Sequence, residues 1–343
     1  LPLAMPLLGP NVNSYRRITP NNSAPINVHW GHDNRTTGFR VPISNGNNRR
    51  VENRIAGADA NPYLAFATSL GCGLMGSGIA QVCAQAGYRT VVREVDQAAV
   101  DAGLGRIARF LDNGVTRNKL TAEARDATME RLSGTTSVDA LAECDLIIEA
   151  IVENVDAKRA VFSEVEAVVG PDAVFCSNTS SVCITELAAA TRRPDKFAGM
   201  HFFSPVPIMN LVEVIRGLST TDETYQRVFD FARSLGKQPV TAPDRPGFIV
   251  NRLLIPYLLS AIRAFESGCG TVEDVDTAMT LGCGHPMGPF TLLDFVGLDT
   301  TYYITNIMYE EFRDPAYASP PLLKRMVLAG RLGRKSGHGF YKY

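Results

Sequence analysis

Two side chains that can exchange protons, His201 and Glu213, stand 12 residues apart in the middle of the chain. His201 ends a predicted strand over Phe197–Phe202, and Glu213 lies inside the apolar segment Leu211–Ile215. A carboxylate between two valines is costly to bury unless it is paired. Beside an imidazole it would fix the tautomer and favour the protonated ring, which suits a general base working near neutral pH. A purely structural histidine at a strand end is the open alternative.

A glycine-rich segment, Gly71-Cys-Gly-Leu-Met-Gly76, could hold a phosphate group. It fits GxGxxG between a predicted strand over Ala65–Leu70 and a predicted helix that continues to Ala86. The first glycine permits a tight turn, the second lets the backbone approach a pyrophosphate, and the third lets helix and strand pack closely. Because a helix N-terminus offers unpaired N–H groups to an anion, the pattern predicts dinucleotide binding at Gly71, Gly73, Leu74, Met75 and Gly76.

An acidic residue follows the glycine segment at the spacing that dinucleotide binding requires. Glu94 ends the predicted strand Thr90–Glu94, 18 residues after Gly76, where a carboxylate would accept hydrogen bonds from an adenosine ribose. Asp96 is the open alternative for this role. A carboxylate here disfavours a 2′-phosphate, so we expect NAD rather than NADP, although the neighbouring Arg93 leaves NADP open.

Short apolar strands and amphipathic helices alternate along the chain from about residue 66. Continuous apolar strands, each followed by a helix, are typical of a parallel sheet covered on both faces. The predicted fold class is therefore α/β, a Rossmann-type doubly wound, mostly parallel sheet followed by an all-helical C-terminal domain, with an irregular N-terminal appendage. The strands beyond residue 100 are predicted over Cys144–Ala150, Ala173–Ser177, Phe197–Phe202 and Leu211–Ile215.

A proline-rich segment, Pro243-Asp-Arg-Pro-Gly247, is typical of a linker between two domains. Behind it the strand signals stop, and helical spacing continues over 248–267, 272–281 and 290–295. We therefore predict three parts: an appendage over 1–65, an NAD-binding domain over 66–247 and a helical domain over 248–343.

Composition excludes several classes of function. The 343 residues carry a net charge of −1 and are 45% hydrophobic, which gives no whole-protein field for a nucleic acid or an anionic membrane surface. No apolar run is long enough for a membrane-spanning helix. The seven cysteines form no CxxC pair, so we expect thiols in a reducing, cytoplasmic compartment and no metal site.

Seven ordered motifs from Gly71 to the last residue resemble the 3-hydroxyacyl-CoA dehydrogenase family, in particular its short-chain 3-hydroxybutyryl-CoA type. Besides the glycine segment they are Glu149-Ala-Ile-Val-Glu-Asn154, Ser177-Asn-Thr-Ser-Ser181, His201-Phe-Phe-Ser-Pro-Val-Pro207, Pro246-Gly-Phe-Ile-Val-Asn-Arg252, Pro286-Met-Gly-Pro-Phe290 with Leu293-Asp294, and Gly337-His-Gly-Phe-Tyr341. The resemblance implies an NAD-dependent oxidoreductase that interconverts (S)-3-hydroxyacyl-CoA and 3-oxoacyl-CoA as a homodimer.

By this resemblance His201 would accept the hydroxyl proton, and Glu213 would orient and stabilise it. Ser180 and Asn251 match the positions that hydrogen-bond the reacting oxygen, although Ser180 could simply form a turn and Asn251 could cap a helix.

The resemblance also implies contacts with the cofactor and with coenzyme A. Glu153, Lys158 and Lys335 match cofactor positions, while an exposed pair at a helix start is the alternative for the first two. Arg117 and Lys119 match basic residues presented to coenzyme A, or they form an ordinary basic helix end. Ser204 stands where the family usually has an asparagine near the nicotinamide, and its shorter side chain reaches less far.

The first 66 residues resemble a different family. They carry seven arginines and three acids. Their motifs are Asn13-Ser-Tyr-Arg-Arg17, Asn34-Arg35 with Arg40-Val-Pro42, and Arg50-Val-Glu-Asn-Arg54 followed by Ala58-Asp-Ala-Asn-Pro-Tyr-Leu64. These motifs are similar to part of the glutamine synthetase catalytic barrel. That resemblance implies glutamate or phosphate contacts at Arg35, Arg40 and Arg54 and a metal ligand at Glu52. The fragment lacks the other carboxylates that a synthetase needs around its divalent ions. The two resemblances meet at Leu70–Gly71, as in a fusion.

We therefore expect a dehydrogenase whose substrate is an acyl-CoA. Two alternatives stay open: a dehydrogenase fold impaired by its N-terminal fusion, and a glutamate–amine ligase.

Overall fold

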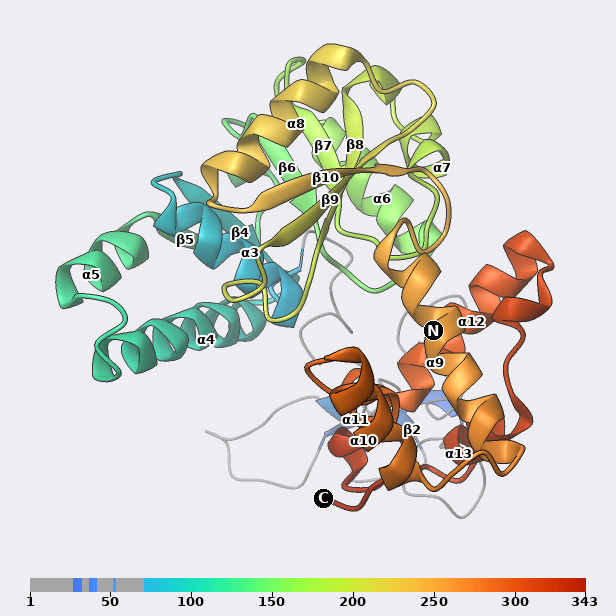
Figure 1. Cartoon of the computed structure of the whole chain (residues 1–343). Helices are drawn as coiled ribbons and strands as arrows, with labels where there is room; N and C mark the ends of the chain where they lie inside the picture. The colour runs from blue at the N-terminus through green and yellow to red at the C-terminus, as the bar shows by residue number, and fades with distance from the viewer. Residues whose placement is uncertain (1–26, 33–36, 42–51, 54–70) are drawn as a thin grey trace. The chain divides into compact units, whose positions relative to one another are not determined.

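The computed structural model describes residues 27–32, 37–41, 52–53 and 71–343 (Figure 1). The expected strand over 65–70 and the arginines Arg35 and Arg54 lie outside these residues. The chain divides into two compact units, Leu1–Asp244 and Arg245–Tyr343.

Three short strands belong to the segment that precedes the glycine turn. They are β1 (Asn27–His32), β2 (Thr37–Val41) and β3 (Glu52–Asn53), and they form one sheet in the order β1-β2-β3. β1 runs parallel to β2, and β3 runs antiparallel to it, with Arg40 and Glu52 as register partners. The composition of the segment did not predict these strands.

The main sheet of the first unit has five strands in the order β10-β9-β8-β7-β6 (Figure 1). The strands β6, β7 and β8 are parallel, β9 is antiparallel to β8, and β10 is parallel to β9. Their bounds are β6 (Leu146–Glu149), β7 (Val174–Ser177), β8 (Phe197–Phe202), β9 (Leu211–Arg216) and β10 (Gln238–Pro243). The predicted α/β fold with a mostly parallel sheet is confirmed, but the sequence did not reveal β10, whose two prolines are poor strand formers.

Alternate residues of the main sheet pack against helices on opposite faces. Val174 and Cys176 of β7 pack in one core with α3 (Leu74–Gln85) and α8 (Asp222–Ser234). Phe175 between them points to the other face, where it stacks with Phe162 of α6 (Val155–Glu166) at 5.4 Å between ring centroids. This double cover explains why the strands are continuously apolar.

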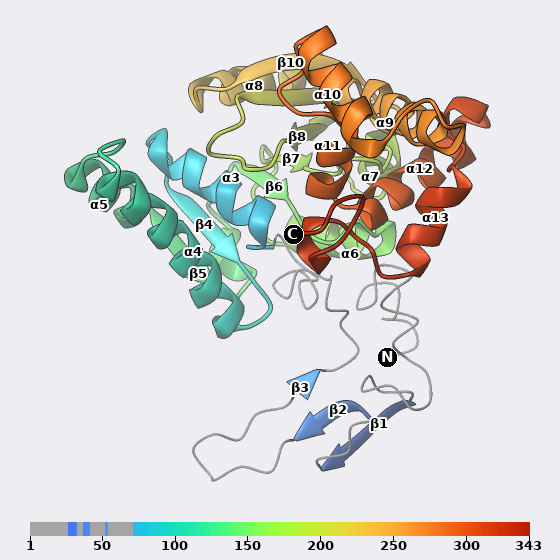
Figure 2. The same cartoon turned by 60° about the horizontal axis from the view of Figure 1, so that its bottom comes forward.

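A second, two-stranded sheet pairs β4 (Thr90–Arg93) with β5 (Leu132–Thr135) in parallel. The helices α4 (Gln97–Thr116) and α5 (Ala122–Glu130) lie beside this pair (Figure 2). A cavity of about 780 Å³ is lined by β4 on one side and by residues of β6 on the other. Gly71 also lines it, so the cavity lies next to the glycine turn.

The second unit is helical, as predicted for the C-terminal domain. Its helices are α9 (Val250–Glu266), α10 (Val272–Cys283), α11 (Pro289–Val296), α12 (Leu298–Phe312) and α13 (Pro321–Leu328). They enclose a core that includes Leu258 and Phe290. The C-terminal tail is tied to this core because the backbone N–H groups of Phe340 and Tyr341 donate to Asp294, at 2.9 and 2.8 Å.

Within the described part of the chain, no helix is both long and apolar enough to cross a bilayer. The seven cysteines are all free thiols. Cys72, Cys83 and Cys176 are buried, but Cys269 and Cys283 are exposed, so burial does not explain every thiol.

Candidate active site

His201 and Glu213 meet because β8 and β9 are antiparallel. The two residues are direct register partners, so their side chains leave the same face of the sheet at neighbouring positions. His201 Nδ1 lies 2.7 Å from Glu213 Oε2. The side chain of His201 is 8% exposed and that of Glu213 is fully buried. The apolar surroundings of the Glu213 carboxylate therefore contain the partner that its burial requires.

The orientation of this pair determines which imidazole nitrogen can react. Nδ1 faces the carboxylate, so proton exchange with a substrate falls to Nε2 on the opposite side of the ring. The ring of Phe203 lies 4.6 Å away between centroids and restricts how the imidazole can tilt. A carboxylate, an oriented imidazole and a second nitrogen directed away from the acid form the arrangement of a general base.

The glycine turn has the geometry of an anion cradle. Gly73 is the N-cap of α3 and no side chain caps the helix. A Cβ on Gly76 would lie 2.1 Å from the carbonyl oxygen of Gly71, so only glycine fits there. Helix N-terminal N–H groups beside a turn that excludes side chains suit a pyrophosphate.

Glu94 lies directly beside this turn and has an unused acceptor. The backbone N–H of Cys72 donates to Glu94 Oε1, whereas no described residue donates to the buried Oε2. Burial raises the pKa of Glu94 to about 7, against the hydrogen bond from Cys72, which lowers it. An unpartnered buried oxygen is costly in the protein alone, and a ribose hydroxyl would supply the missing donor.

The two neighbours that could compete with Glu94 have other partners. Asp96 is the N-cap of α4 and accepts a hydrogen bond from the N–H of Ala99 at 2.7 Å. Arg93 donates to Glu164 through both terminal nitrogens, at 3.0 and 2.9 Å. Its guanidinium is therefore engaged and is not directed at a 2′-phosphate, and these residues fit NAD better than NADP.

Ser180 belongs to a turn after β7 that is held by one carboxylate. Glu153 Oε1 accepts from the N–H groups of Ser180 and Ser181, at 2.8 and 3.0 Å, and from the hydroxyl of Thr179 at 2.6 Å. These hydrogen bonds hold the turn in place, and Ser180 in it is half-buried.

Lys158 is buried, so the alternative of an exposed pair at the helix start is wrong. Its side chain is 1% exposed and its ammonium lies 2.7 Å from Glu149 Oε1 and 3.2 Å from Glu153 Oε2. Glu149 had no role predicted from the sequence. The sequence signal for this buried pair was an acid that ends an apolar strand, followed by a second acid and a lysine.

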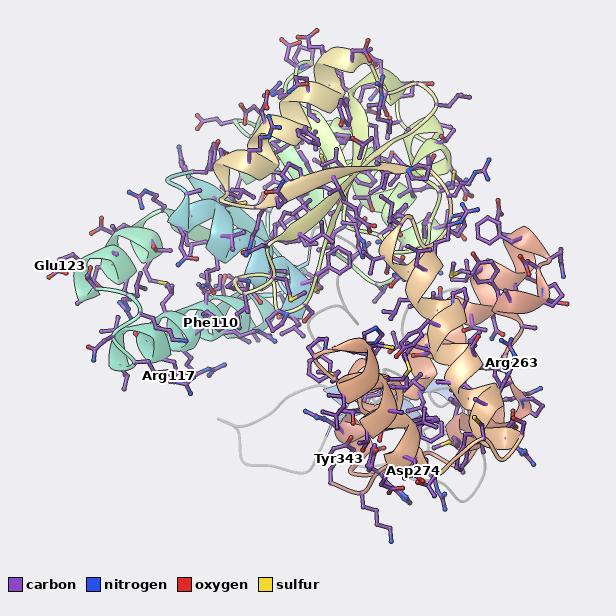
Figure 3. The ribbon with its side chains drawn as sticks, in the orientation of Figure 1. Phe110, Arg117, Glu123, Arg263, Asp274 and Tyr343 are labelled. Carbon is purple, nitrogen blue, oxygen red and sulfur yellow. The ribbon has the colours of Figure 1, made fainter. Side chains whose placement is uncertain are left out.

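The remaining candidate residues are spread over both units. Ser204 is exposed after β8, and Arg117 and Lys119 are exposed at the end of α4, where Figure 3 shows Arg117 directed outward. Leu74 is exposed and Met75 half-buried at the start of α3.

In the second unit, Asn251 and Lys335 have defined surroundings. Asn251 is the second residue of α9 and is not its N-cap, which is Ile249. Capping therefore does not explain the asparagine. Lys335 Nζ lies 2.6 Å from Asp299 Oδ2, and Asp299 is 7% exposed. Lys335 is thus paired with a buried carboxylate.

The glycine turn, Glu94 and the imidazole–carboxylate pair together define a nucleotide-binding oxidoreductase of the α/β class. The sequence model of the 3-hydroxyacyl-CoA dehydrogenase NAD-binding domain matches residues 67–245, and that of the C-terminal domain of the same family matches residues 247–343. The chain belongs to the 3-hydroxyacyl-CoA dehydrogenase family.

Individual relatives agree with this assignment. A 3-hydroxybutyryl-CoA dehydrogenase of Mycobacterium tuberculosis is 50% identical over 276 residues, covering 80% of this chain and 96% of the relative. The human mitochondrial hydroxyacyl-coenzyme A dehydrogenase is 45% identical over 293 residues, covering 80% of this chain and 90% of the relative. The crystal structure of (S)-3-hydroxybutyryl-CoA dehydrogenase from Ralstonia eutropha matches with a TM-score of 0.78 at 44% identity, covering 79% of this chain and 96% of that one.

The N-terminal segment matches a second family. The model of the glutamine synthetase catalytic domain matches residues 1–104 and overlaps the dehydrogenase match over residues 67–104. The predicted double resemblance is therefore confirmed. In the described part of the chain no cluster of His, Cys, Asp or Glu is arranged to hold a metal ion.

Proposed function

We propose that the protein oxidises short (S)-3-hydroxyacyl-CoA, with 3-hydroxybutyryl-CoA as the expected substrate, to 3-oxoacyl-CoA, and catalyses the reverse reaction. The observation that supports this proposal most directly is the 2.7 Å contact between His201 Nδ1 and Glu213 Oε2. The names of the relatives support the acyl-CoA substrate and the short acyl chain.

When bound, NAD⁺ would supply the acceptor for the hydride that leaves C3 of the substrate. His201 Nε2 takes the proton of the 3-hydroxyl group, so the C3–H bond breaks as the carbonyl forms. Glu213 holds the ring through Nδ1 and stabilises the imidazolium that results. Ser180 and Asn251 would hydrogen-bond the reacting oxygen, and Arg117 and Lys119 would face coenzyme A. Among the other cofactor positions, Ser204 would lie near the nicotinamide, and Lys335 would make a further contact with the cofactor.

The direct test is the reduction of acetoacetyl-CoA by NADH, which is followed as a decrease in the absorbance of NADH at 340 nm. We expect turnover by the wild type and a rate at least about 100-fold lower for His201→Ala, because a general base contributes about 10²–10⁴-fold. Equal rates for the two proteins would remove His201 as the base. Acetoacetyl-CoA should also exceed longer 3-oxoacyl-CoA substrates in kcat/KM.

We further propose that the protein is a cytoplasmic homodimer that associates through its second unit. Leu253 and Leu281, on α9 and α10, are 71% and 80% exposed, and large exposed apolar side chains mark interaction surfaces. The seven free thiols support a reducing compartment. Light scattering should give twice the monomer mass for the wild type and a lower mass for Leu281→Lys.

We also propose that the NAD-binding domain begins near residue 66 and ends near residue 247. The family match begins at residue 67, and the cavity between β4 and β6 lies beside Gly71. The strand that the sequence predicts over 65–70 would belong to this domain. Hydrogen exchange should then be slow at these residues, and exchange as fast as in a free loop would contradict the proposal.

A further inference from the structure

The loop over 203–210 joins β8 to β9, the two strands of the imidazole–carboxylate pair. Its first residue is Phe203, whose ring lies 4.6 Å from that of His201 between centroids, and its second is Ser204, the expected neighbour of the nicotinamide. The structure describes this loop in full, and within it only Val206 is buried. A loop with so little buried surface opens easily unless other contacts hold it.

One side of the loop rests on α3, the helix that begins at the glycine turn. Val206 packs in one core with Ile79 and Val82 of this helix. A Cβ on Gly78 would lie 2.9 Å from the Cβ of Val206, so the loop can come this close only because α3 has a glycine there. The loop thus connects the helix of the phosphate site with the strand of the imidazole.

The other side of the loop is held by a buried ammonium. Lys237 is 8% exposed, and its Nζ donates to the carbonyl oxygens of Val206 and Met209, at 2.6 and 2.9 Å. Among the described residues no carboxylate pairs with this ammonium, and burial lowers the pKa of Lys237. A buried cation without a carboxylate is costly, so its hydrogen bonds to the loop offset that cost.

The backbone on both sides of Lys237 fixes the point from which its side chain starts. α8 ends in a Schellman motif, in which the N–H groups of Gly236 and Lys237 donate to carbonyls of the last turn, at 2.9 and 3.2 Å. Gly236 has a φ of +71°, which favours glycine. The next residue, Gln238, begins β10 and donates its N–H to Asn210 at the end of the loop, at 2.7 Å.

Apolar packing does not hold the loop at this point. A cavity of about 300 Å³ is lined by Pro207 and Asn210 of the loop together with Lys237. The ammonium therefore supplies a contact that the neighbouring side chains do not replace.

We propose that Lys237 is a positioning residue, whose ammonium holds the loop 203–210 on α3 and thereby places Ser204 for contact with the cofactor. The proposal rests on the proposed function for the role of Ser204. Lys237 acts through the loop, since its Nζ is directed at two backbone carbonyls. A lysine that only stabilised the fold would lower the melting temperature and leave loop and cofactor affinity unchanged in the folded protein.

The decisive experiment measures hydrogen exchange in the loop of Lys237→Met. Methionine keeps an unbranched side chain but has no N–H donor. The N–H groups of Ile208 and Met209 donate to the carbonyl of Pro205, each at 2.9 Å. Their exchange should become at least about tenfold faster, because the variant loses two hydrogen bonds from a charged group. Unchanged exchange in the folded variant would overturn the proposal.

Fluorescence titration of NADH tests the step from the loop to the cofactor. The Kd for NADH should rise about fivefold in Lys237→Met and in Ser204→Ala, as for the loss of one hydrogen bond. The double variant should bind no more weakly than either single variant, because both changes remove the same contact. Additive losses in the double variant, or an unchanged Kd in Lys237→Met, would overturn the proposal.

Lys196→Met provides a matched control in the same unit. Lys196 Nζ also donates to a backbone carbonyl, that of Pro171 at 2.9 Å, and to Asp172 Oδ1 at 2.8 Å. Its loss should leave the exchange of the loop and the Kd for NADH unchanged. Changes as large as those in Lys237→Met would show a general loosening of the unit and would overturn the proposal.

The exchange measurement also separates this proposal from the proposed function. If the wild type binds no NADH, the proposed function fails, while the exchange still decides whether Lys237 holds the loop. Should Lys237→Met not fold, Lys237→Gln replaces it, because the shorter amide cannot reach both carbonyls. Faster exchange at Ile208 and Met209 is then expected, and unchanged exchange contradicts the proposal.

Discussion

Two groups of buried charges lie at the same edge of the main sheet and differ in their partners. Glu213 near the start of β9 faces an imidazole, whereas Glu149 at the end of β6 faces an ammonium. An imidazole can give up its proton near neutral pH, but an ammonium held by two carboxylates cannot. Similar burial thus gives a pair suited to proton transfer in one place and a fixed ion pair in the other.

The two groups of charges also differ in their access to solvent. His201 is 8% exposed and directs one nitrogen away from Glu213, while Lys158 is 1% exposed and surrounded by its acceptors. We therefore expect substitutions in the first pair to reduce catalysis more than stability. Substitutions in the second group should reduce stability first.

The largest expected effect is on kcat of Glu213→Gln. A neutral amide cannot stabilise the imidazolium and allows the wrong tautomer, so kcat should fall by about 10²–10⁴-fold. The melting temperature should change little because the amide still fills the site. Steady-state assays beside thermal melts check this, and an unaltered kcat would show that the two groups of charges do not differ in function.

Lys158→Met should have the next largest effect, on the free energy of unfolding. Breaking a buried ion pair on one side costs about 3–5 kcal/mol. Urea unfolding followed by circular dichroism measures the loss. A stability equal to the wild type would show that Lys158 is solvated and that the two groups of charges do not differ in burial.

Glu94→Gln should weaken cofactor binding and stabilise the protein at high pH. The pKa of Glu94 is raised to about 7 from an ordinary 4.5 by burial, so its ionisation costs stability. Wild-type stability should therefore decline as the pH rises from about 4.5 to 7 and stay level above.

The Glu94→Gln variant lacks this decline. It should melt higher than the wild type at pH 8 and no higher at pH 4.5. Calorimetry should show NADH binding weaker by about tenfold, the loss of one hydrogen bond to a charged group. A variant that melts lower at pH 8 would contradict the assigned burial cost.

The smallest expected effect comes from Ser204→Asn, which restores the residue usual in the family. The longer amide should strengthen NADH binding by about two- to fivefold through one hydrogen bond. Fluorescence titration of NADH measures it, with Ser219→Asn as an exposed control. Weaker binding would show that Ser204 is adapted to its surroundings.

The glycine turn and the His201–Glu213 pair could be predicted from the sequence because their signals are local. Continuous apolar strands mark a doubly covered sheet, and an acid inside such a strand needs a partner. The antiparallel direction of β9, which makes the two residues register partners, was not visible in the sequence.

The sequence could not predict two kinds of contact. Some join residues that are far apart in the chain, and others bury residue types that are usually exposed. Arg93 and Glu164 are 71 positions apart, so nothing local showed that the arginine is engaged. Lys158 looked like a solvated helix residue because lysine is rarely buried. Glu149 had no predicted partner, because the ammonium of Lys158 comes within reach only when α6 packs back onto the sheet.

The proposed role of the Glu213-held imidazole in exchanging the substrate proton is tested most directly by kcat/KM for acetoacetyl-CoA reduction in the wild type and in His201→Gln. We predict that the variant loses nearly all activity, because an amide cannot exchange that proton. A variant that keeps the wild-type rate would contradict this role.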